Sequence, residues 1–244
     1  SGEAASRARI GLPGRQRELL QKLLDSGKPV IAVLMNGRPL ALDWEAEHLT
    51  AIIEAWQLGI QMGTAIAQIL FGDFNPQARL SASFPVDAGQ CPIYYNHMKT
   101  GRPSSKSKFT SRYLDVPTEA LYPFGYGLSY TTFDYTDLLV EEKPDRLTVR
   151  VTVKNSGNRA GVETVQLYLQ DITASLVRPV RELKGYMQIK LEPQAWQVVA
   201  IDLLKENMGF YDNEGIYRLE NGEFTVYVGK NSRETLQETV TIKF

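Results

Sequence analysis

The sequence is poor in the side chains that bind metals or form disulfides. It contains one cysteine, Cys91, and two histidines, His48 and His97, among 244 residues. A single cysteine excludes a disulfide within the chain, and so few histidines and cysteines argue against a zinc site. We therefore expect no metal and no cofactor, and we interpret both histidines and Cys91 as structural or surface residues.

The chain also lacks an excess of charge and long apolar runs. Its 27 basic and 28 acidic residues almost cancel, so we expect neither nucleic acid nor an anionic membrane as a partner. The longest apolar run, residues 29–35, is far shorter than the roughly 20 residues of a membrane-spanning helix. The compartment stays open between periplasmic or secreted and cytoplasmic, because any signal peptide would lie upstream of this sequence.

The first half of the chain alternates helical and strand patterns. Leucines recur at helical spacing in segment 15–29, and segment 59–76 has a similar apolar period. Two apolar runs, 30–37 and 49–56, are typical of parallel strands buried on both faces. The pattern predicts a mostly parallel sheet with flanking helices, but too few strands are visible to complete it. We therefore expect an incomplete α/β sandwich domain with an unpaired sheet edge or exposed apolar surface.

The second half has the two-residue period of antiparallel strands. In segment 146–155 the residues Leu147, Val149, Val151 and Val153 alternate with polar residues, and three later segments repeat the pattern. This predicts an all-β sandwich. We place an α/β domain at residues 1–130 and the sandwich at 131–244. The irregular connection at about 85–123 is too long for an ordinary loop, so we expect it to cover a surface or serve a site.

Few residues suggest chemistry by themselves. Glu3 lies on a Gly- and Ala-rich segment, where it is either a mobile proton donor or an ordinary solvated carboxylate. Tyr94, Tyr95 and Trp56 have side chains that stack on sugars, although burial is the commoner role of such aromatics. Segment 124–133, "FGYGLSYTTF", lacks the flanking strand and helix of a dinucleotide site, so it predicts an aromatic hinge between the domains.

Four stretches become specific when they are taken in order. They are "SGEAASR" (1–7), "VLMNGRPLAL" (33–42), "LFGDFNPQARLSASFP" (70–85) and "LYPFGYGLSYTTF" (121–133). In this order and spacing they resemble the C-terminal part of bacterial β-glucosidases of glycoside hydrolase family 3, of the type often called periplasmic. Segment 165–186 resembles the fibronectin type III-like domain of the same family.

The resemblance implies an architecture and a function. Such enzymes carry a barrel, an α/β sandwich domain and a fibronectin type III-like domain. Glu3 matches the acid/base glutamate of the family, whereas the nucleophilic aspartate lies on an N-terminal barrel that this sequence does not include. The implied activity is that of a retaining, exo-acting β-glucosidase that hydrolyses terminal non-reducing β-D-glucosyl residues of a β-glucoside or oligosaccharide. The sequence of the β-sandwich shows no clustered carboxylates and no aromatic row, so we expect it to act as a scaffold, with polysaccharide or surface binding as the alternative.

Two alternatives remain at this point. In the first, the parent protein is a β-xylosidase or another family 3 glycosidase, because the resemblance places sugar selection on barrel loops outside the sequence. Alternatively, the chain is a non-catalytic carbohydrate-binding or interaction module. The residues that bind substrate stay unassigned, and formation of a homo-oligomer stays open.

Overall fold

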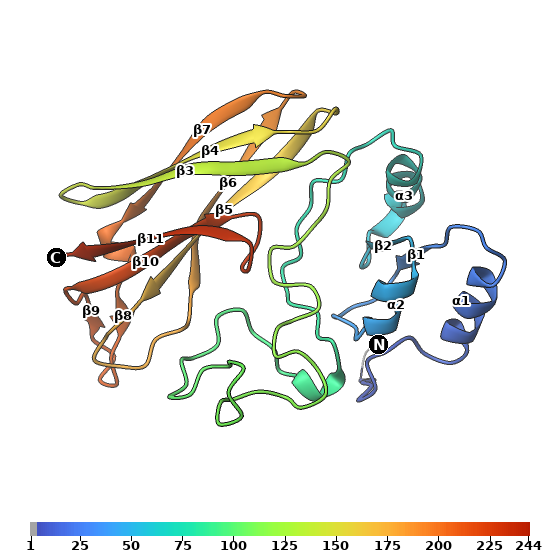
Figure 1. Cartoon of the computed structure of the whole chain (residues 1–244), viewed down its shortest axis with the longest axis horizontal. Helices are drawn as coiled ribbons and strands as arrows, with labels where there is room; N and C mark the ends of the chain where they lie inside the picture. The colour runs from blue at the N-terminus through green and yellow to red at the C-terminus, as the bar shows by residue number, and fades with distance from the viewer. Residues whose placement is uncertain (1–3) are drawn as a thin grey trace.

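The computed structural model describes residues 4–244, which form two structured parts joined by an irregular segment (Figure 1). The first part is built from short helices and strands, and the second part is built from antiparallel strands alone. The elements of the first part are α1 (Gln16–Leu24), β1 (Ile31–Leu34), α2 (Asp43–His48), β2 (Ala51–Glu54), the 3-10 helix η1 (Gly59–Gln61) and α3 (Met62–Leu70).

The sheet of the first part is parallel, as the sequence predicts. β1 pairs with β2 in a register that places Ile31 opposite Ala51 and Leu34 opposite Glu54. These are the only two strands of this sheet within residues 4–244. A small core of Leu34, Leu42 and Phe84 packs beside them. The prediction of an incomplete α/β domain is therefore confirmed.

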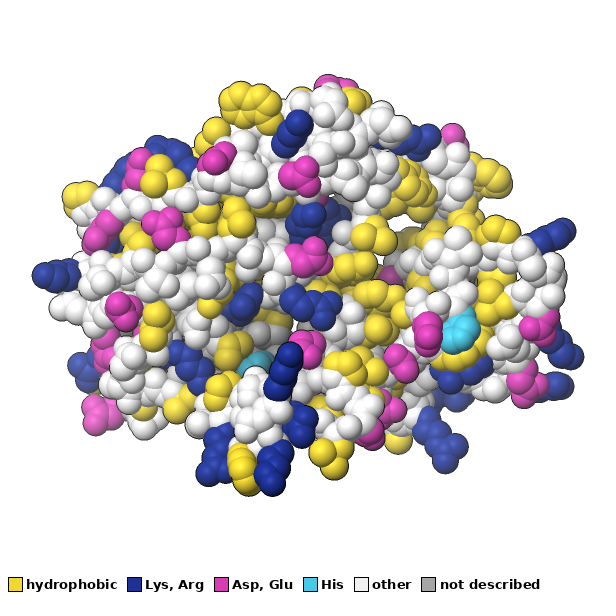
Figure 2. All heavy atoms as spheres, in the orientation of Figure 1, with side chains coloured by type: hydrophobic (Ala, Val, Ile, Leu, Met, Phe, Trp, Pro, Cys, Tyr) yellow, Lys and Arg dark blue, Asp and Glu magenta, His cyan; other side chains and the backbone are white. Residues whose placement is uncertain are grey.

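The expected burial of the first strand on both faces is wrong. Only Leu34 of β1 is buried, and Ile31 is 47% exposed. Two strands cannot be enclosed by short helices, of which α1 buries none of its side chains. Apolar residues such as Met35 and Phe71 are strongly exposed as a result, and Figure 2 shows hydrophobic side chains on the visible face of this part.

The second part is a sandwich of two antiparallel sheets. One has the strand order β3-β4-β7 and the other β11-β10-β5-β6. The side chains of Leu147, Val149, Val151 and Val153 are at most 2% exposed in the core between the sheets, which confirms the predicted alternation. The elements are β3 (Phe133–Glu142), β4 (Arg146–Asn155), β5 (Gly161–Asp171), β6 (Glu182–Leu191), β7 (Trp196–Leu204), η3 (Lys205–Asn207), β8 (Phe210–Tyr211), β9 (Tyr217–Arg218), β10 (Gly222–Gly229) and β11 (Thr235–Ile242).

The irregular connection covers the outer face of the larger sheet. Apart from the 3-10 helix η2 (Ala88–Gln90) it contains no helix. The ring of Tyr95 stacks on Phe124 with centroids 4.2 Å apart, and both rings meet the buried Tyr168 of β5 edge-on. The Lys99 ammonium donates to the backbone carbonyl of Asp171 at 2.6 Å. The segment therefore covers a surface, which is one of the two roles the sequence predicts.

Gly125 of the "FGYGLSYTTF" segment is required by its surroundings. Gly125 has φ +81°, and a Cβ added there would lie 1.9 Å from Oε1 of Gln166. Nε2 of Gln166 also donates to the Gly125 carbonyl at 3.0 Å. We expect Gly125→Ala to lower the free energy of unfolding by about 2–4 kcal/mol, through the left-handed backbone and overpacking together. Urea denaturation measures this change.

Gly101→Ala is the matched control for this substitution. A Cβ at Gly101 meets nothing within 4 Å, and its backbone is not left-handed. Its free energy of unfolding should change by less than about 0.5 kcal/mol. Equal stability of the two variants would contradict the assignment of Gly125 as a position that requires glycine.

Candidate functional site

The predicted catalytic residue, Glu3, lies outside the described residues. The segment that follows it runs beside the connection after β1. The Ile10 carbonyl accepts a hydrogen bond of 3.0 Å from the Ala41 backbone N–H. The Arg7 carbonyl accepts a second bond from Nη2 of Arg38. Two bonds therefore fix the main chain just downstream of Glu3.

The connection after β1 is braced in turn by the end of β2. Nδ2 of Asn36 donates to the Arg38 carbonyl at 2.7 Å and to Oε2 of Glu54 at 3.2 Å. Oε1 of Glu54 accepts from the Trp56 backbone N–H at 3.0 Å. Because β1 and β2 are parallel, their carboxyl ends meet at one edge, where ligand sites of α/β sheets commonly lie.

Three features of this edge are costly to the fold. Burial raises the pKa of Glu54, and the hydrogen bonds from Trp56 and Asn36 oppose that rise. Trp56 has φ +48°, which is rare for a bulky side chain. The Asn36 Oδ1 is buried and has no hydrogen-bond partner among residues 4–244. Such strain persists where the surrounding structure enforces it, often near functional sites.

A cavity of about 590 Å³ lies between the Arg7 segment and the irregular connection. Its lining includes Arg7, Arg38, Tyr94, Tyr95 and Phe124. Tyr94 is exposed, whereas Tyr95 is stacked against Phe124. The structure thus brings the predicted aromatic pair to the same region as the Glu3-bearing segment, and it leaves one of the two rings accessible.

The other candidate residues either pack against neighbouring aromatic rings or lie exposed on the surface. The ring of Trp56 packs against Phe84 at 5.8 Å, and His48 stacks on Trp44 at 4.6 Å. His97 is exposed on the irregular connection beside the Met98 carbonyl. Cys91 is a free, exposed thiol. None of them forms a catalytic arrangement with another candidate within the part of the chain that the structure describes.

Neither a metal-binding cluster nor a membrane-spanning helix occurs within residues 4–244. Residues 4–244 hold no group of three or more His, Cys, Asp or Glu side chains placed to bind a metal ion. In the same range, every helix is too short or too polar to span a bilayer.

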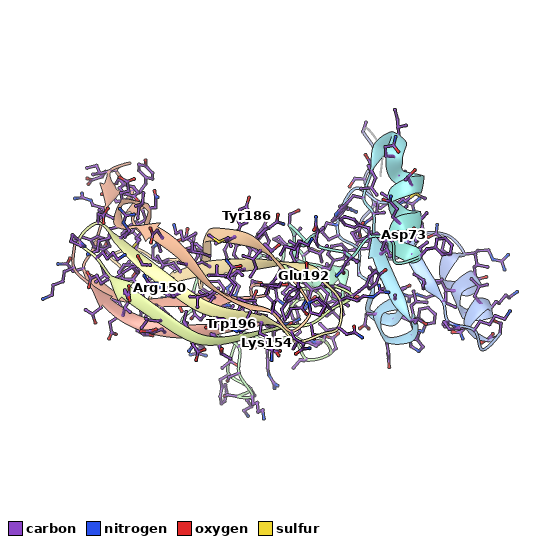
Figure 3. All side chains as sticks on the ribbon, turned by 90° about the horizontal axis from the view of Figure 1, so that it is seen from above. Asp73, Arg150, Lys154, Tyr186, Glu192 and Trp196 are labelled. Carbon is purple, nitrogen blue, oxygen red and sulfur yellow. The ribbon has the colours of Figure 1, made fainter. Side chains whose placement is uncertain are left out.

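The sandwich presents three strongly exposed aromatics on different sheets, of which Tyr211 of β8 is 69% exposed. Trp196 of β7 is 64% exposed and Tyr186 of β6 is 67% exposed. Figure 3 shows Trp196 beside Lys154, which is its register partner on β4. Because these three aromatics belong to three different sheets, they do not form the continuous aromatic row that a polysaccharide platform needs. This arrangement favours the predicted scaffold role.

A buried ion pair that the sequence did not reveal couples the two parts. Nη2 of Arg79 lies 2.7 Å from Oε2 of Glu163 on β5, with side chains only 9% and 2% exposed. The Tyr135 hydroxyl of β3 donates to the other carboxylate oxygen at 2.8 Å. Burial raises the pKa of Glu163, and the positive charge of Arg79 opposes that rise.

Asn75 adds a second tie between the parts. Its Nδ2 donates to the Ala160 carbonyl at 2.9 Å, and its Oδ1 accepts from the Tyr130 backbone N–H at 2.7 Å. Asn75 and Arg79 both fall in the "LFGDFNPQARLSASFP" stretch. Part of the specificity of that stretch is therefore structural, because it joins the α/β part to the sandwich.

The fold consists of an α/β part followed by a fibronectin-like sandwich that packs against it, and this combination defines the class of protein. Residues 1–130 match the model of the glycosyl hydrolase family 3 C-terminal domain, and residues 163–232 match the fibronectin type III-like domain. The chain belongs to glycoside hydrolase family 3. The family and fold that the sequence resemblance implied are both confirmed.

The relatives are glycosidases of the same family. A periplasmic β-glucosidase of Salmonella typhimurium is 45% identical over 242 residues, which cover 96% of this chain and 32% of that protein. A β-xylosidase of Formosa agariphila is 38% identical, with coverages of 99% and 33%. A mutant β-glucosidase of Listeria innocua, solved with laminaribiose, superposes with a TM-score of 0.93 at 40% identity and covers 100% of this chain and 34% of its own.

These coverages have a direct consequence for the site. The chain spans about a third of the length of the relatives it matches. The candidate site among its described residues consists of the segment at residues 7–10 and the carboxyl edge of the parallel sheet.

Proposed function

We propose that the chain is the C-terminal part of a retaining, exo-acting β-glucosidase. In this proposal the domain limits are 1–130 and 131–244, and Glu3 is the acid/base residue. The observation that carries the proposal is the 40% identity to a β-glucosidase along the entire chain. The match of residues 1–130 to the family 3 C-terminal domain adds support, because it includes the "GEAASR" segment.

The proposed chemistry uses two carboxyl groups about 5–5.5 Å apart. An aspartate on the upstream barrel attacks the anomeric carbon and forms a glycosyl-enzyme. Glu3 protonates the departing glycosidic oxygen and later takes a proton from the water that hydrolyses the intermediate. The ionised aspartate raises the pKa of such a neighbour, because like charges disfavour a second ionisation.

The proposed partner is the barrel of the same protein. Exposed apolar residues of the α/β part, such as Met35, Ile60 and Phe71, offer a surface that such a part covers. Because the barrel covers this surface in the proposal, the two-stranded parallel sheet is tolerated although it is exposed in this chain. A homo-oligomer is the competing way to cover the same surface.

A β-xylosidase is the second candidate function. It is favoured by the 38% identity to a β-xylosidase over nearly the whole chain. The choice between glucose and xylose is proposed to rest with barrel loops. Assays of the longer protein with p-nitrophenyl β-glucoside and p-nitrophenyl β-xyloside separate the two, because the preferred sugar has the larger kcat/KM.

The first test of the proposal compares the 244-residue chain with a longer protein that includes the barrel. We expect the 244-residue chain to release no p-nitrophenol above the blank, because it lacks the nucleophile, whereas the longer protein hydrolyses the substrate. Circular dichroism should show that both are folded. Release by the short chain that disappears in its Glu3→Ala variant would contradict the division of the active site.

A further inference from the structure

We propose that the sandwich carries a binding site for a neutral saccharide, in a cavity between the irregular connection and the loop that joins β5 to β6. The cavity has a volume of about 380 Å³, which is within the range of small-molecule sites. Residues 99–101 of the connection form one wall, and residues 171–178 form the other. The inference concerns binding alone and does not rest on the proposed hydrolysis.

Two buried polar atoms that line this cavity have no partner. Oδ1 of Asp171 and Nε of Arg178 are both buried and make no hydrogen bond among residues 4–244. Asp171 is 7% exposed, and the side chain of Arg178 is 13% exposed. Because unpaired buried atoms are costly, we expect the cavity to hold a group that pairs with both of them.

The charged groups of the cavity are near one another, but they do not pair across it. Burial raises the pKa of Asp171, and the positive charges of Arg178 and Lys99 oppose that rise. Both cations have other partners. Nη2 of Arg178 lies 2.7 Å from Oε2 of Glu182, and Nζ of Lys99 donates to the backbone carbonyls of Asp171 and Ile172 at 2.6 and 2.7 Å. Oδ1 of Asp171 therefore faces the cavity without a cation bonded to it.

Both walls of the cavity are held in place by hydrogen bonds. The backbone N–H of Val180 donates to the His97 carbonyl at 2.9 Å, which joins the connection to the β5–β6 loop. The Glu220 carboxylate accepts from the backbone N–H of Ser175 at 2.8 Å and from its hydroxyl at 2.5 Å. A site that is already ordered binds its ligand without the entropic cost of ordering its walls.

The donors and acceptors of the cavity select a neutral ligand that carries hydroxyl groups. A carboxylate only accepts hydrogen bonds, and a guanidinium only donates them. Two neighbouring hydroxyls satisfy both groups, because one can donate to Oδ1 of Asp171 while the other accepts from Nε of Arg178. The positive charges of Lys99 and Arg178 disfavour a metal ion, and the Asp171 carboxylate disfavours an anion. Saccharides carry such neighbouring hydroxyls, and a pocket of this kind needs no continuous aromatic row.

The test measures binding of laminaribiose to the 244-residue chain by saturation-transfer difference NMR. We expect a saturable signal. Asp171→Asn should raise the dissociation constant at least about 10-fold, because the accepting group loses its charge. Arg178→Lys keeps a positive charge but removes the Nε–H, and it should weaken binding by a similar factor. The control is Asp145→Asn, which alters an exposed carboxylate between β3 and β4 and should leave the dissociation constant unchanged.

A second variant fills the cavity without altering a buried charge. Val177 lines the cavity and is 64% exposed. Val177→Trp should therefore narrow the cavity and weaken laminaribiose binding while the fold is kept. Circular dichroism of every variant checks that the chain is folded.

Three outcomes would overturn the inference. A folded chain without a saturable signal would show that the cavity holds only water. Binding that is unchanged in both Asp171→Asn and Val177→Trp would place the saccharide elsewhere on the chain. Binding of calcium chloride or inorganic phosphate that Asp171→Asn abolishes, without binding of laminaribiose, would assign the cavity to an ion.

Discussion

Replacement of Glu3 by alanine in the full-length protein should lower kcat/KM for phenyl β-glucoside by about 10²–10⁴-fold, which is the usual contribution of a positioned general acid. The departing phenoxide needs a proton, and no other group is proposed to supply it. A 2,4-dinitrophenyl leaving group is stable as an anion, so formation of the glycosyl-enzyme should be largely spared. Steady-state kinetics on the two substrates measure this difference.

Sodium azide provides the diagnostic second arm of the Glu3→Ala experiment. Breakdown of the glycosyl-enzyme by water needs a base, whereas azide attacks the anomeric carbon as an anion and displaces the aspartate carboxylate. Azide should therefore restore turnover of the activated substrate and yield β-glucosyl azide with retained configuration. Equal losses on both substrates without azide rescue would remove Glu3 from the acid/base role.

The second large effect is expected at the Arg79–Glu163 ion pair. Glu163→Ala should lower the free energy of unfolding by about 3–5 kcal/mol, because it leaves the buried Arg79 charge without its partner. The Tyr135 hydroxyl loses its acceptor in the same variant. Urea denaturation followed by tryptophan fluorescence measures the loss, and the α/β part should separate from the sandwich at lower urea concentration.

An exposed ion pair is the control for Glu163→Ala. Arg15 and Glu18 pair at 2.7 Å on the surface at the start of α1, and Glu18→Ala should cost no more than about 0.5 kcal/mol. The double variant Arg79→Met with Glu163→Leu should be more stable than either single variant, because it removes both buried charges. A loss at Glu163→Ala no larger than that at Glu18→Ala would show that the buried pair does not couple the two parts.

The fold was predictable where local pattern and tertiary burial agree. The alternation of Leu147 to Val153 identified β4, because one side of that strand faces a dry core. Helix α2 was missed because its six residues are too few to show a helical period. The sequence also gives no sign that Glu45 is buried, because its partner Arg17, at 3.0 Å, comes from the separate helix α1.

The candidate site was predictable only in part, for a different reason. Glu3 is proposed through the family resemblance alone, since nothing in its local pattern distinguishes it from a solvated carboxylate. The hydrogen bonds around the connection after β1 use three backbone groups, namely the Arg7 carbonyl, the Arg38 carbonyl and the Trp56 N–H. Backbone groups occur at every residue, so no sequence pattern marks the ones that a distant side chain will bind. The left-handed conformation of Trp56 is equally invisible in the sequence, because glycine is the usual sign of such a backbone.

The stack of Tyr95 and Phe124 over Tyr168 bears on how this family can be recombined in the laboratory. A graft that begins at β3 would leave out the irregular connection. The larger sheet would then expose Tyr168, which is fully buried in this chain. The unit to be transferred therefore has to include the irregular connection together with the sandwich. Domain boundaries chosen from the strands alone would remove the segment that covers Tyr168.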